Sequence, residues 1–433
     1  MQPRKPSVRV GWLAGARGKS HSAIVRARGT WLAAAVFVSV AIATTGIVRA
    51  SGRQIVDTGR YSEYAESLQS DLVPYRDFDV EYPPGALALF VLPALFVSGE
   101  STYFWAFAAL MAAAGAAGVI LTAGALERLG RPPAARRLVL WLLAFSPLLF
   151  GGVLLTRFDL VPAALVAGGT LLALLERPRM AAVVLGIAAA VKLYPLLLLP
   201  LLALWAWRRF DRREATLASA LALGVVVLAY APFALVSPDG VAQSLWRQLS
   251  RPLQIESLGA GVLVLLHDVF GFELAVETSH GSQNLSGTAA TVMGVALSLV
   301  GAAAILGLWV AFARSEATNE RLVLSAAAVL VAFVAFGKVV SPQFLVWLLF
   351  PLALVQGRRG RSAGACLAVA AVATAVWFPW LYFDLTRELD SLVGALVVLR
   401  GVALAAALVA LGWPAATEPQ SSPRPPAAAG GRL

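Results

Sequence analysis

The stretch from Asp57 to Pro84, DTGRYSEYAESLQSDLVPYRDFDVEYPP, is an acidic loop between two long apolar segments. Its charged residues up to Glu81 are the acids Asp57, Glu63, Glu66, Asp71, Asp77, Asp79 and Glu81 and the bases Arg60 and Arg76. Carboxylates clustered beside hydrocarbon indicate proton transfer or cation handling at a membrane surface. For any single acid, a solvated loop position is the simpler interpretation. Asp57 differs because it follows the first apolar run, near Ala50, by seven residues, where a membrane enzyme can hold a base against a lipid substrate.

On both sides of this loop the chain consists of apolar runs. Hydrophobic residues make up 59% of the chain and charged residues only 14%, which lies outside the range of soluble proteins. The runs cover residues 30–50, 102–126, 138–156, 161–175, 180–191, 194–207, 216–236, 287–313, 322–337, 342–356, 363–383 and 391–413. The sequence therefore predicts an all-α polytopic membrane protein, a bundle of about twelve transmembrane helices without a separate soluble domain.

Several apolar runs are shorter than the roughly 20 residues that an upright span needs, among them 180–191, 194–207 and Pro83–Val97. Runs 180–191 and 194–207 flank Lys192, and we expect half-buried helices or spans shortened by local thinning of the bilayer. The run Pro83–Val97 starts with two prolines, which fix φ and begin a helix. It is predicted to be a short interfacial or re-entrant helix in the first outer loop.

Charge orients the predicted bundle. The N-terminal 29 residues carry seven bases and no acid, which places them in the cytoplasm. If Pro83–Val97 does not cross, that side collects 24 of the 35 Lys and Arg residues and only seven of the 24 acids. Loops 51–82 and 237–286 then face outward. The net charge of +11 thus reflects orientation in the cell membrane, and we expect no nucleic-acid partner.

The same pattern divides the chain into three parts. Residues 1–29 are predicted to be a disordered basic cytoplasmic arm, and residues 30–413 the transmembrane domain. Residues 414–433 are rich in Pro, Ala and Gly and are predicted to be a disordered cytoplasmic tail. The sequence contains no Cys or His residues at the spacing of a metal site, because Cys366 is the single cysteine and the three histidines are far apart. We favour a reaction without cofactor or metal, and dependence on a divalent metal stays open.

Short polar islands at the ends of apolar runs share the outward face with the acidic loop. They are TRFDL with Arg157 and Asp159, VKLYP with Lys192 and Tyr194, SRPLQIES with Arg251, Gln254 and Glu256, and FGKVVSPQ with Lys338, Ser341 and Gln343. An ionisable group against hydrocarbon is costly unless it is paired, snorkels or lines a cavity. Snorkelling explains one lysine, but four cationic islands on one face favour a shared cavity. Cations there fit a lipid phosphate, and a carboxylate fits proton abstraction from a hydroxyl.

Five of these segments resemble the GT-C class of membrane glycosyltransferases and, within it, glycosyltransferase family 87. The segments are PYRDFDVEYPPGAL, TRFDLVPAAL, AAAVKLYPLLLLP, RPLQIESLG and FGKVVSPQFLVWLL, in this order. The resemblance, from Arg49 to Trp347, implies a GT-C-like bundle and an inverting transferase of cell-envelope glycolipid synthesis. It implies a polyprenyl-phosphate sugar donor, typically mannose, used on the extracytoplasmic face. The family's catalytic aspartate lies in a D-x-x-x-Y context, which Asp57 and Tyr61 match, whereas its late functional histidine has no counterpart near Lys338.

These considerations assign roles to named residues. Asp57 is the predicted general base, and Lys192, Arg251, Lys338 and Arg157 are predicted to bind the donor phosphate. Predicted substrate contacts are Tyr61, Asp77, Asp79, Glu81, Tyr82, Asp159, Tyr194, Gln254, Glu256, Ser341 and Gln343. The expected partners are the polyprenyl-phosphate sugar, a lipid or glycan acceptor and membrane lipids. The sugar and the acceptor stay open.

Two other classes compete with the enzyme. A transporter or flippase of lipid-linked sugars would also present cations to a cavity, and Arg400, deep in the last apolar run, fits that class better. One long acidic outer loop favours an enzyme, because carriers place their binding residues near the midplane. A non-catalytic scaffold accounts poorly for the cationic islands.

Overall fold

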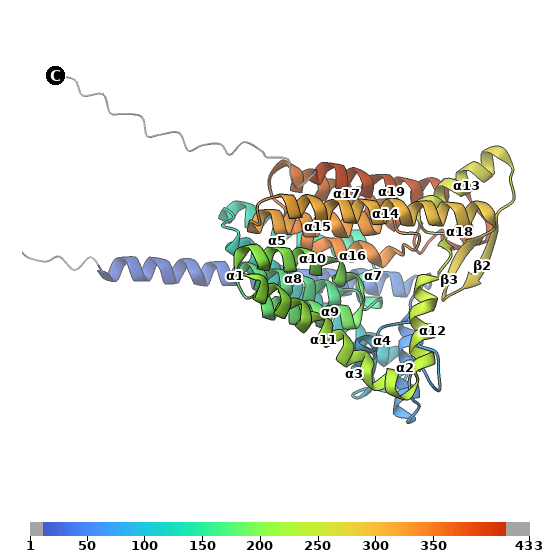
Figure 1. The fold of residues 1–433 in the computed structure, drawn as a ribbon, viewed down its shortest axis with the longest axis horizontal. Helices are drawn as coiled ribbons and strands as arrows, with labels where there is room; N and C mark the ends of the chain where they lie inside the picture. The colour runs from blue at the N-terminus through green and yellow to red at the C-terminus, as the bar shows by residue number, and fades with distance from the viewer. Residues whose placement is uncertain (1–11, 413–433) are drawn as a thin grey trace, which may run out of the picture.

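The computed structural model describes residues 12–412 as a helical bundle with one small sheet at one end (Figure 1). In the first half of the chain the helices are α1 (Trp12–Ala50), α2 (Thr58–Gln69), α3 (Pro84–Ala94), α4 (Glu100–Arg128), α5 (Pro133–Phe145), α6 (Pro147–Phe150), α7 (Val153–Thr156), α8 (Leu160–Leu174), α9 (Pro178–Val191), the 3₁₀ helix η1 (Tyr194–Leu198) and α10 (Leu199–Arg209). The second half contains α11 (Arg212–Val236), α12 (Pro238–Leu249), α13 (Leu258–Phe270), α14 (Thr288–Arg314), α15 (Asn319–Ala335), the 3₁₀ helix η2 (Pro342–Leu345), α16 (Val346–Leu354), α17 (Gly357–Trp377), α18 (Tyr382–Glu388) and α19 (Ser391–Leu411).

The twelve predicted apolar runs are mostly helical where the structure describes them, although 138–156, 194–207, 342–356 and 363–383 are each divided between two or three helices. Within the described residues, seven helical segments are long and apolar enough to cross a membrane. They are Ala27–Ala50, Glu100–Arg128, Pro133–Phe150, Arg212–Val236, Thr288–Arg314, Gly357–Trp377 and Ser391–Leu411. The protein is therefore nearly all-α and built for a membrane, while the crossing of all twelve helices stays a prediction.

Long peripheral helices surround short buried ones. At 1.5 Å per residue, α11 is about 38 Å long, more than the roughly 30 Å of a bilayer's hydrocarbon. Only Ala218 and Ala222 of this helix are buried, while Leu228 and Leu235 are 73% and 85% exposed. Such a continuous apolar surface is what a lipid-facing helix presents. By contrast, eight of the nine residues of α16 are buried, so this helix forms part of the core.

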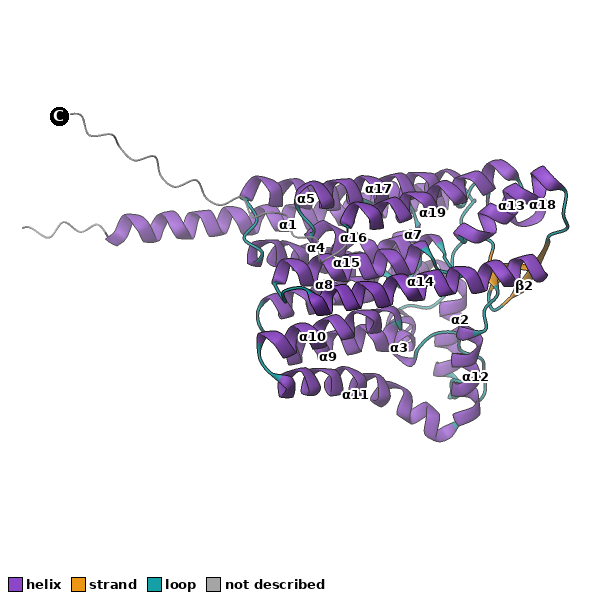
Figure 2. Ribbon diagram, turned by 45° about the horizontal axis from the view of Figure 1, so that its top comes forward, coloured by secondary structure: helices purple, strands orange, loops and turns teal. Residues whose placement is uncertain are grey.

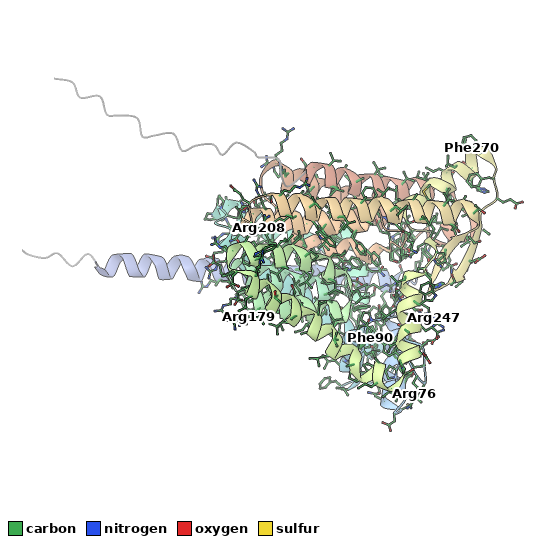
Figure 3. All side chains as sticks on the ribbon, in the orientation of Figure 1. Arg76, Phe90, Arg179, Arg208, Arg247 and Phe270 are labelled. Carbon is green, nitrogen blue, oxygen red and sulfur yellow. The ribbon has the colours of Figure 1, made fainter. Side chains whose placement is uncertain are left out.

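Two connecting segments, residues 51–83 and residues 237–286, lie at the same end of the bundle. Figure 1 places α2, α12 and the strands at this end, and α1 projects from the other. In Figure 3, Arg76 and Arg247 lie at the loop-rich end, far from Arg179 and Arg208. The loops predicted to share a face are therefore together, and the side of the membrane on which they lie stays a prediction.

The predicted tail and the first eleven residues of the predicted arm lie outside the described residues. Residues 1–11 and 413–433 are not described. The helix α1 begins at Trp12 and so extends into the segment predicted to be disordered. The sequence after Trp12 contains no proline before Ala50 and is rich in alanine and arginine, which favour helix over coil.

A three-stranded antiparallel sheet is the one part of the fold that the all-α prediction missed. Strands β2 (Ala275–Ser279) and β3 (Ser282–Ser286) form a hairpin, and β1 (Leu253–Gln254) pairs with β3. The hairpin turns at His280 and Gly281, whose φ values of 52° and 67° are those of a type I′ turn. Figure 2 shows these strands at the loop-rich end. The sheet fixes the segment 251–257, which carries one of the polar islands.

The predicted short helix of the first loop is α3. With 11 residues it is about 16 Å long, too short to cross a bilayer. It packs against the end of α9, where a Cβ at Gly85 would lie 2.6 Å from the carbonyl oxygen of Ala190. Glycine at this position therefore allows α3 to pack closely against the backbone of Ala190 and Val191, just before Lys192. Its location in the membrane interface stays a prediction.

Candidate active site

A cavity of about 370 Å³ opens at the loop-rich end of the bundle. Segments that are far apart in the chain meet there: the start of α2, the residues before α3, the ends of α7 and α9, the segment before α13 and η2. The predicted site residues that line it are Asp57, Glu81, Tyr82, Arg157, Lys192, Tyr194, Arg251, Gln254, Glu256, Ser341 and Gln343. The four polar islands and the acidic loop thus contribute to one cavity.

Asp57 stands at the N-terminus of α2 and faces this cavity. Its Oδ2 atom lies 3.0 Å from the Arg157 Nε atom and 3.4 Å from the Tyr61 hydroxyl, which donates to it. Both contacts use Oδ2, so among the described residues Oδ1 accepts no hydrogen bond. The Asp57 side chain is 34% exposed, while that of Arg157 is 7% exposed. The site therefore contains a carboxylate held in place by a buried cation, with one oxygen open to a ligand.

An aromatic cluster fixes the position of Asp57. The Tyr61 ring stacks on Phe90 with 4.2 Å between ring centroids and meets the edges of Phe158 at 5.8 Å and Tyr82 at 6.0 Å. Such pairs stabilise beyond the area they bury. Tyr61 is only 1% exposed and lies beneath Asp57, outside the cavity lining. The i, i+4 spacing of the D-x-x-x-Y pair thus positions the carboxylate across one helical turn.

Lys192 is held by its neighbours at the end of α9. Its Nζ atom donates to Asp159 Oδ1 at 2.6 Å, and the same oxygen accepts a hydrogen bond from Trp347 Nε1 at 2.6 Å. The ammonium also lies 4.6 Å from the centroid of the Phe158 ring and 5.0 Å from that of Trp347, within cation–π range. Asp159 is 1% exposed and lies behind the cavity wall. Its charge balances that of Lys192 inside the protein.

Arg251 is the lining cation without an acidic partner. Its Nη2 atom donates to Ser282 Oγ at 2.9 Å, and none of the described acids lies within ion-pair distance. The Nε atom is buried and has no hydrogen-bond partner among the described residues. Burial also lowers the pKa of Arg251, against the opposing charges of Glu81 and Glu256. A half-buried cation with a buried, unused donor beside a cavity is costly until an anion binds.

Glu256 is a second lining carboxyl, buried to 3% exposure. Its side chain accepts hydrogen bonds from the Gln254 amide and from Ser341 Oγ, the latter at 3.4 Å. Arg400 of α19 is 1% exposed and donates to the backbone carbonyl of Glu256. In this structure Arg400 therefore holds the segment before α13 in place. Burial raises the pKa of Glu256 to about 7, although the nearby positive charges of Arg400 and Arg157 oppose the shift.

The raised pKa of Glu256 makes the stability of the protein depend on pH. The folded state keeps the proton up to about pH 7, whereas the unfolded state loses it near the ordinary value of 4.5. The stabilisation is fully present below pH 4.5 and is lost as the pH rises through 7, by an amount on the order of 3 kcal/mol. We expect the melting temperature, followed by tryptophan fluorescence, to fall between about pH 4.5 and pH 7 and to change little from this group above pH 7. Glu256→Gln should flatten this fall, while Glu277→Gln on the exposed face of β2 should not.

Some predicted residues lie outside the cavity lining. Asp77 pairs with Arg76 at 2.8 Å, and Asp79 pairs with Arg247 of α12 at 2.5 Å. Both ion pairs lie on the solvent-exposed surface of the protein. Lys338 points away and donates to the carbonyl oxygen of Leu249 at 3.0 Å. Only the backbone carbonyl of Lys338 supports the site, since it accepts a hydrogen bond from the backbone N–H of Gln254 at 2.9 Å. The structure therefore does not bring Asp77, Asp79 or Lys338 to the cavity.

The helix α12 contributes residues that the sequence analysis missed. Ser244 Oγ donates to the carbonyl oxygen of Val80, and Gln248 Nε2 donates to that of Glu81, both at 2.7 Å. Both side chains also line the cavity. Their i, i+4 spacing on an amphipathic stretch within residues 237–286 is the signal that predicts a helix packed on the first loop. Other lining residues include Tyr230, Phe344, Trp347, Phe378 and Tyr382, which lie too far apart in sequence to be recognised together.

Comparison with known proteins agrees with the resemblance seen in the sequence. A family model described as glycosyltransferase family 87 matches residues 81–342, more than half of the chain. The matched segment contains Lys192, Arg251 and Glu256, while Asp57 precedes it. A search of curated proteins finds no match to the chain.

Proposed function

We propose, since this chain belongs to glycosyltransferase family 87, that it moves a sugar from a polyprenyl-phosphate donor to a hydroxyl on the extracytoplasmic side of the cell membrane. The sugar that we favour is mannose, and the acceptor is a lipid or a glycan. The observation that carries the proposal is the single cavity in which the carboxylate of Asp57 faces the cations Arg157, Lys192 and Arg251. The family supports glycosyl transfer and gives no support to a transporter.

The proposed reaction inverts the sugar's anomeric carbon in one displacement. The acceptor hydroxyl oxygen forms a bond to that carbon, and its proton passes to the Asp57 carboxylate. The bond between the anomeric carbon and the phosphate oxygen breaks, and its electron pair stays on the phosphate. The open Oδ1 of Asp57 suits the proton acceptor, because Oδ2 already binds Arg157. The products are the glycoside and a polyprenyl monophosphate.

The leaving phosphate needs positive charge as the bond breaks. Arg251 suits this role best, because Asp57 neutralises Arg157 and Asp159 neutralises Lys192. Arg251 also presents a fork of donors that matches phosphate oxygens. The described residues include no group of three His, Cys, Asp or Glu side chains that could hold a metal ion. Reaction without a metal stays a prediction that a chelator can test.

A membrane-anchored donor fits the position of the cavity. It opens at the loop-rich end of a bundle whose peripheral helices expose apolar side chains. A phosphate on a polyprenyl chain would lie at that depth with its tail in the bilayer. A nucleotide diphosphate usually needs a metal or a glycine-rich phosphate loop, and this sequence contains no such loop.

The test is sugar transfer by the full chain in liposomes, without any ion gradient. Polyprenyl-monophosphate mannose and a nucleotide mannose are offered separately, each with a membrane lipid extract as acceptor and with and without chelator. We expect labelled product from the polyprenyl donor alone. Activity with the nucleotide sugar alone contradicts the donor assignment. Movement of the lipid-linked sugar across the bilayer without transfer would support the flippase instead.

A further inference from the structure

A second, smaller cavity of about 210 Å³ adjoins the cavity that contains Asp57. It lies between the end of α1, the turn between α6 and α7, and the end of α17. Ile55 and Phe378 line both cavities, so the two share a wall. The carbonyl oxygen of Ile55 accepts a hydrogen bond from Arg157 Nη2 at 3.1 Å. The Asp57–Arg157 pair lines only the first cavity and is joined to the shared wall through this hydrogen bond from Arg157 to Ile55.

The two cavities differ in charge. Six ionisable acid or base side chains line the first, whereas none of the described residues that line the second is charged. Its polar side-chain groups are the hydroxyls of Thr44, Thr45 and Thr156, the amide of Gln54 and the indole of Trp380. We name it the neutral cavity, and the one containing Asp57 the charged cavity. A phosphate prefers the charged cavity, and an uncharged group with hydroxyls fits the neutral one.

Thr45 gives a second indication of a ligand in the neutral cavity. Its side chain is 1% exposed, and among the described residues its Oγ1 atom has no hydrogen-bond partner. The adjacent Thr44 behaves in the usual way for a helix, since its hydroxyl donates to the Val40 carbonyl oxygen at 2.9 Å. A buried hydroxyl without a partner costs about 1–3 kcal/mol. A ligand hydroxyl in the neutral cavity would satisfy Thr45.

Inversion provides the reason for two adjoining cavities. The incoming oxygen must approach the anomeric carbon from the side opposite the leaving phosphate. A base close to the wall between the two ligands can then take the proton, and Asp57 is joined to this wall through Arg157, which binds both its carboxylate and the Ile55 carbonyl. Helices α1 and α17 on either side contain two of the segments long and apolar enough to cross a membrane, Ala27–Ala50 and Gly357–Trp377. A ligand between them can keep an apolar chain in the bilayer.

We propose that the neutral cavity is the acceptor site and that its ligand is the uncharged, hydroxyl-bearing head group of a membrane lipid. This inference rests on the proposed function, and it narrows the acceptor from lipid or glycan to a lipid with a neutral polyol or sugar head group. Thr45 is a positioning residue for the acceptor, and its hydroxyl does not touch the reacting atoms.

The first test compares two threonines that differ only in location. Thr45→Val removes the hydroxyl at constant shape, and we expect the KM for a neutral glycolipid acceptor to rise roughly 5–10-fold. The KM for the donor and the hydrolysis of donor by water should stay unchanged. Thr122→Val is the matched control, because Thr122 in α4 is equally buried, has an equally unpartnered Oγ1 among the described residues and lines neither cavity. It should leave both KM values at the wild-type level.

The second test does not depend on turnover. An alkyl glycoside with a photoreactive group on its sugar is crosslinked to the full chain in nanodiscs, and labelled peptides are mapped by mass spectrometry. We expect labels at 44–48 and 151–156, and competition by an unlabelled neutral glycolipid but not by a polyprenyl phosphate. Equal acceptor KM values for wild type and Thr45→Val, or labels confined to the charged cavity, would overturn the assignment. Labels in the neutral cavity of a protein that transfers no sugar from any donor would instead refute the proposed function.

Discussion

Replacing Asp57 by asparagine is expected to lower kcat by at least about 100-fold, the usual contribution of a general base. Asparagine keeps the size of the side chain and can still accept a hydrogen bond from Arg157, but it cannot take a proton. Folding and membrane insertion should change little, because the aromatic cluster around Tyr61 continues to fix the start of α2. The measurement is single-turnover transfer from the lipid-linked donor, with the unfolding midpoint recorded in parallel.

Asp79→Asn is the matched control for this prediction. Asp79 belongs to the same acidic loop, but it pairs with Arg247 on the exposed surface of the protein and does not line the cavity. Its replacement should leave kcat within about twofold of the wild type, since exposed ion pairs contribute little. Near wild-type turnover of Asp57→Asn would refute the assignment of the base. A fall in Asp79→Asn as large as that in Asp57→Asn would indicate a shared effect on the loop rather than proton transfer.

Replacing Arg251 by alanine is expected to lower kcat/KM for the donor by roughly 10–100-fold. Charge-assisted hydrogen bonds are worth about 1.5–3 kcal/mol each, and Arg251 has a buried donor that nothing else in the described protein occupies. Lysine should restore activity only in part, because an ammonium lacks the planar fork of donors. The KM for the acceptor should not change. The assay varies the concentration of the polyprenyl-phosphate donor at fixed acceptor.

Lys338→Ala serves as the comparison, because the sequence analysis gave both residues the same role. Lys338 carries a similar charge at the same end of the bundle, but its side chain bonds the Leu249 carbonyl and lies outside the cavity lining. We expect a change of no more than about threefold. Lys192→Ala is less informative, since it would leave the buried Asp159 without its cation and cost stability as well as activity. Equal losses in the Arg251 and Lys338 variants would show that the charge acts from a distance.

The class of protein and most of its helices follow from the sequence. Apolar runs form helices in a bilayer because no water is there to satisfy backbone groups, and this requirement acts on each segment separately. The same local reasoning predicted the short helix after Pro83 and drew attention to polar islands at the ends of runs. It missed the hairpin of β2 and β3, because short strands of mixed polarity give a weak periodic signal and depend on their pairing with β1.

Only the tertiary structure decided which basic side chains pair with an acid and which faces the cavity without an acidic partner. Sequence analysis treated Arg157, Lys192, Arg251 and Lys338 alike, yet Asp57 and Asp159 pair with the first two, and Lys338 turns away. These pairings join residues 100 and 33 positions apart, so they depend on how helices cross and not on local spacing. The sequence by itself determined that charged groups would gather at the ends of an apolar bundle, with the acidic loop and the polar islands at the same end, since hydrocarbon excludes charge elsewhere. The packing of the helices decided their partners, because ion pairs and hydrogen bonds need contacts within a few ångströms.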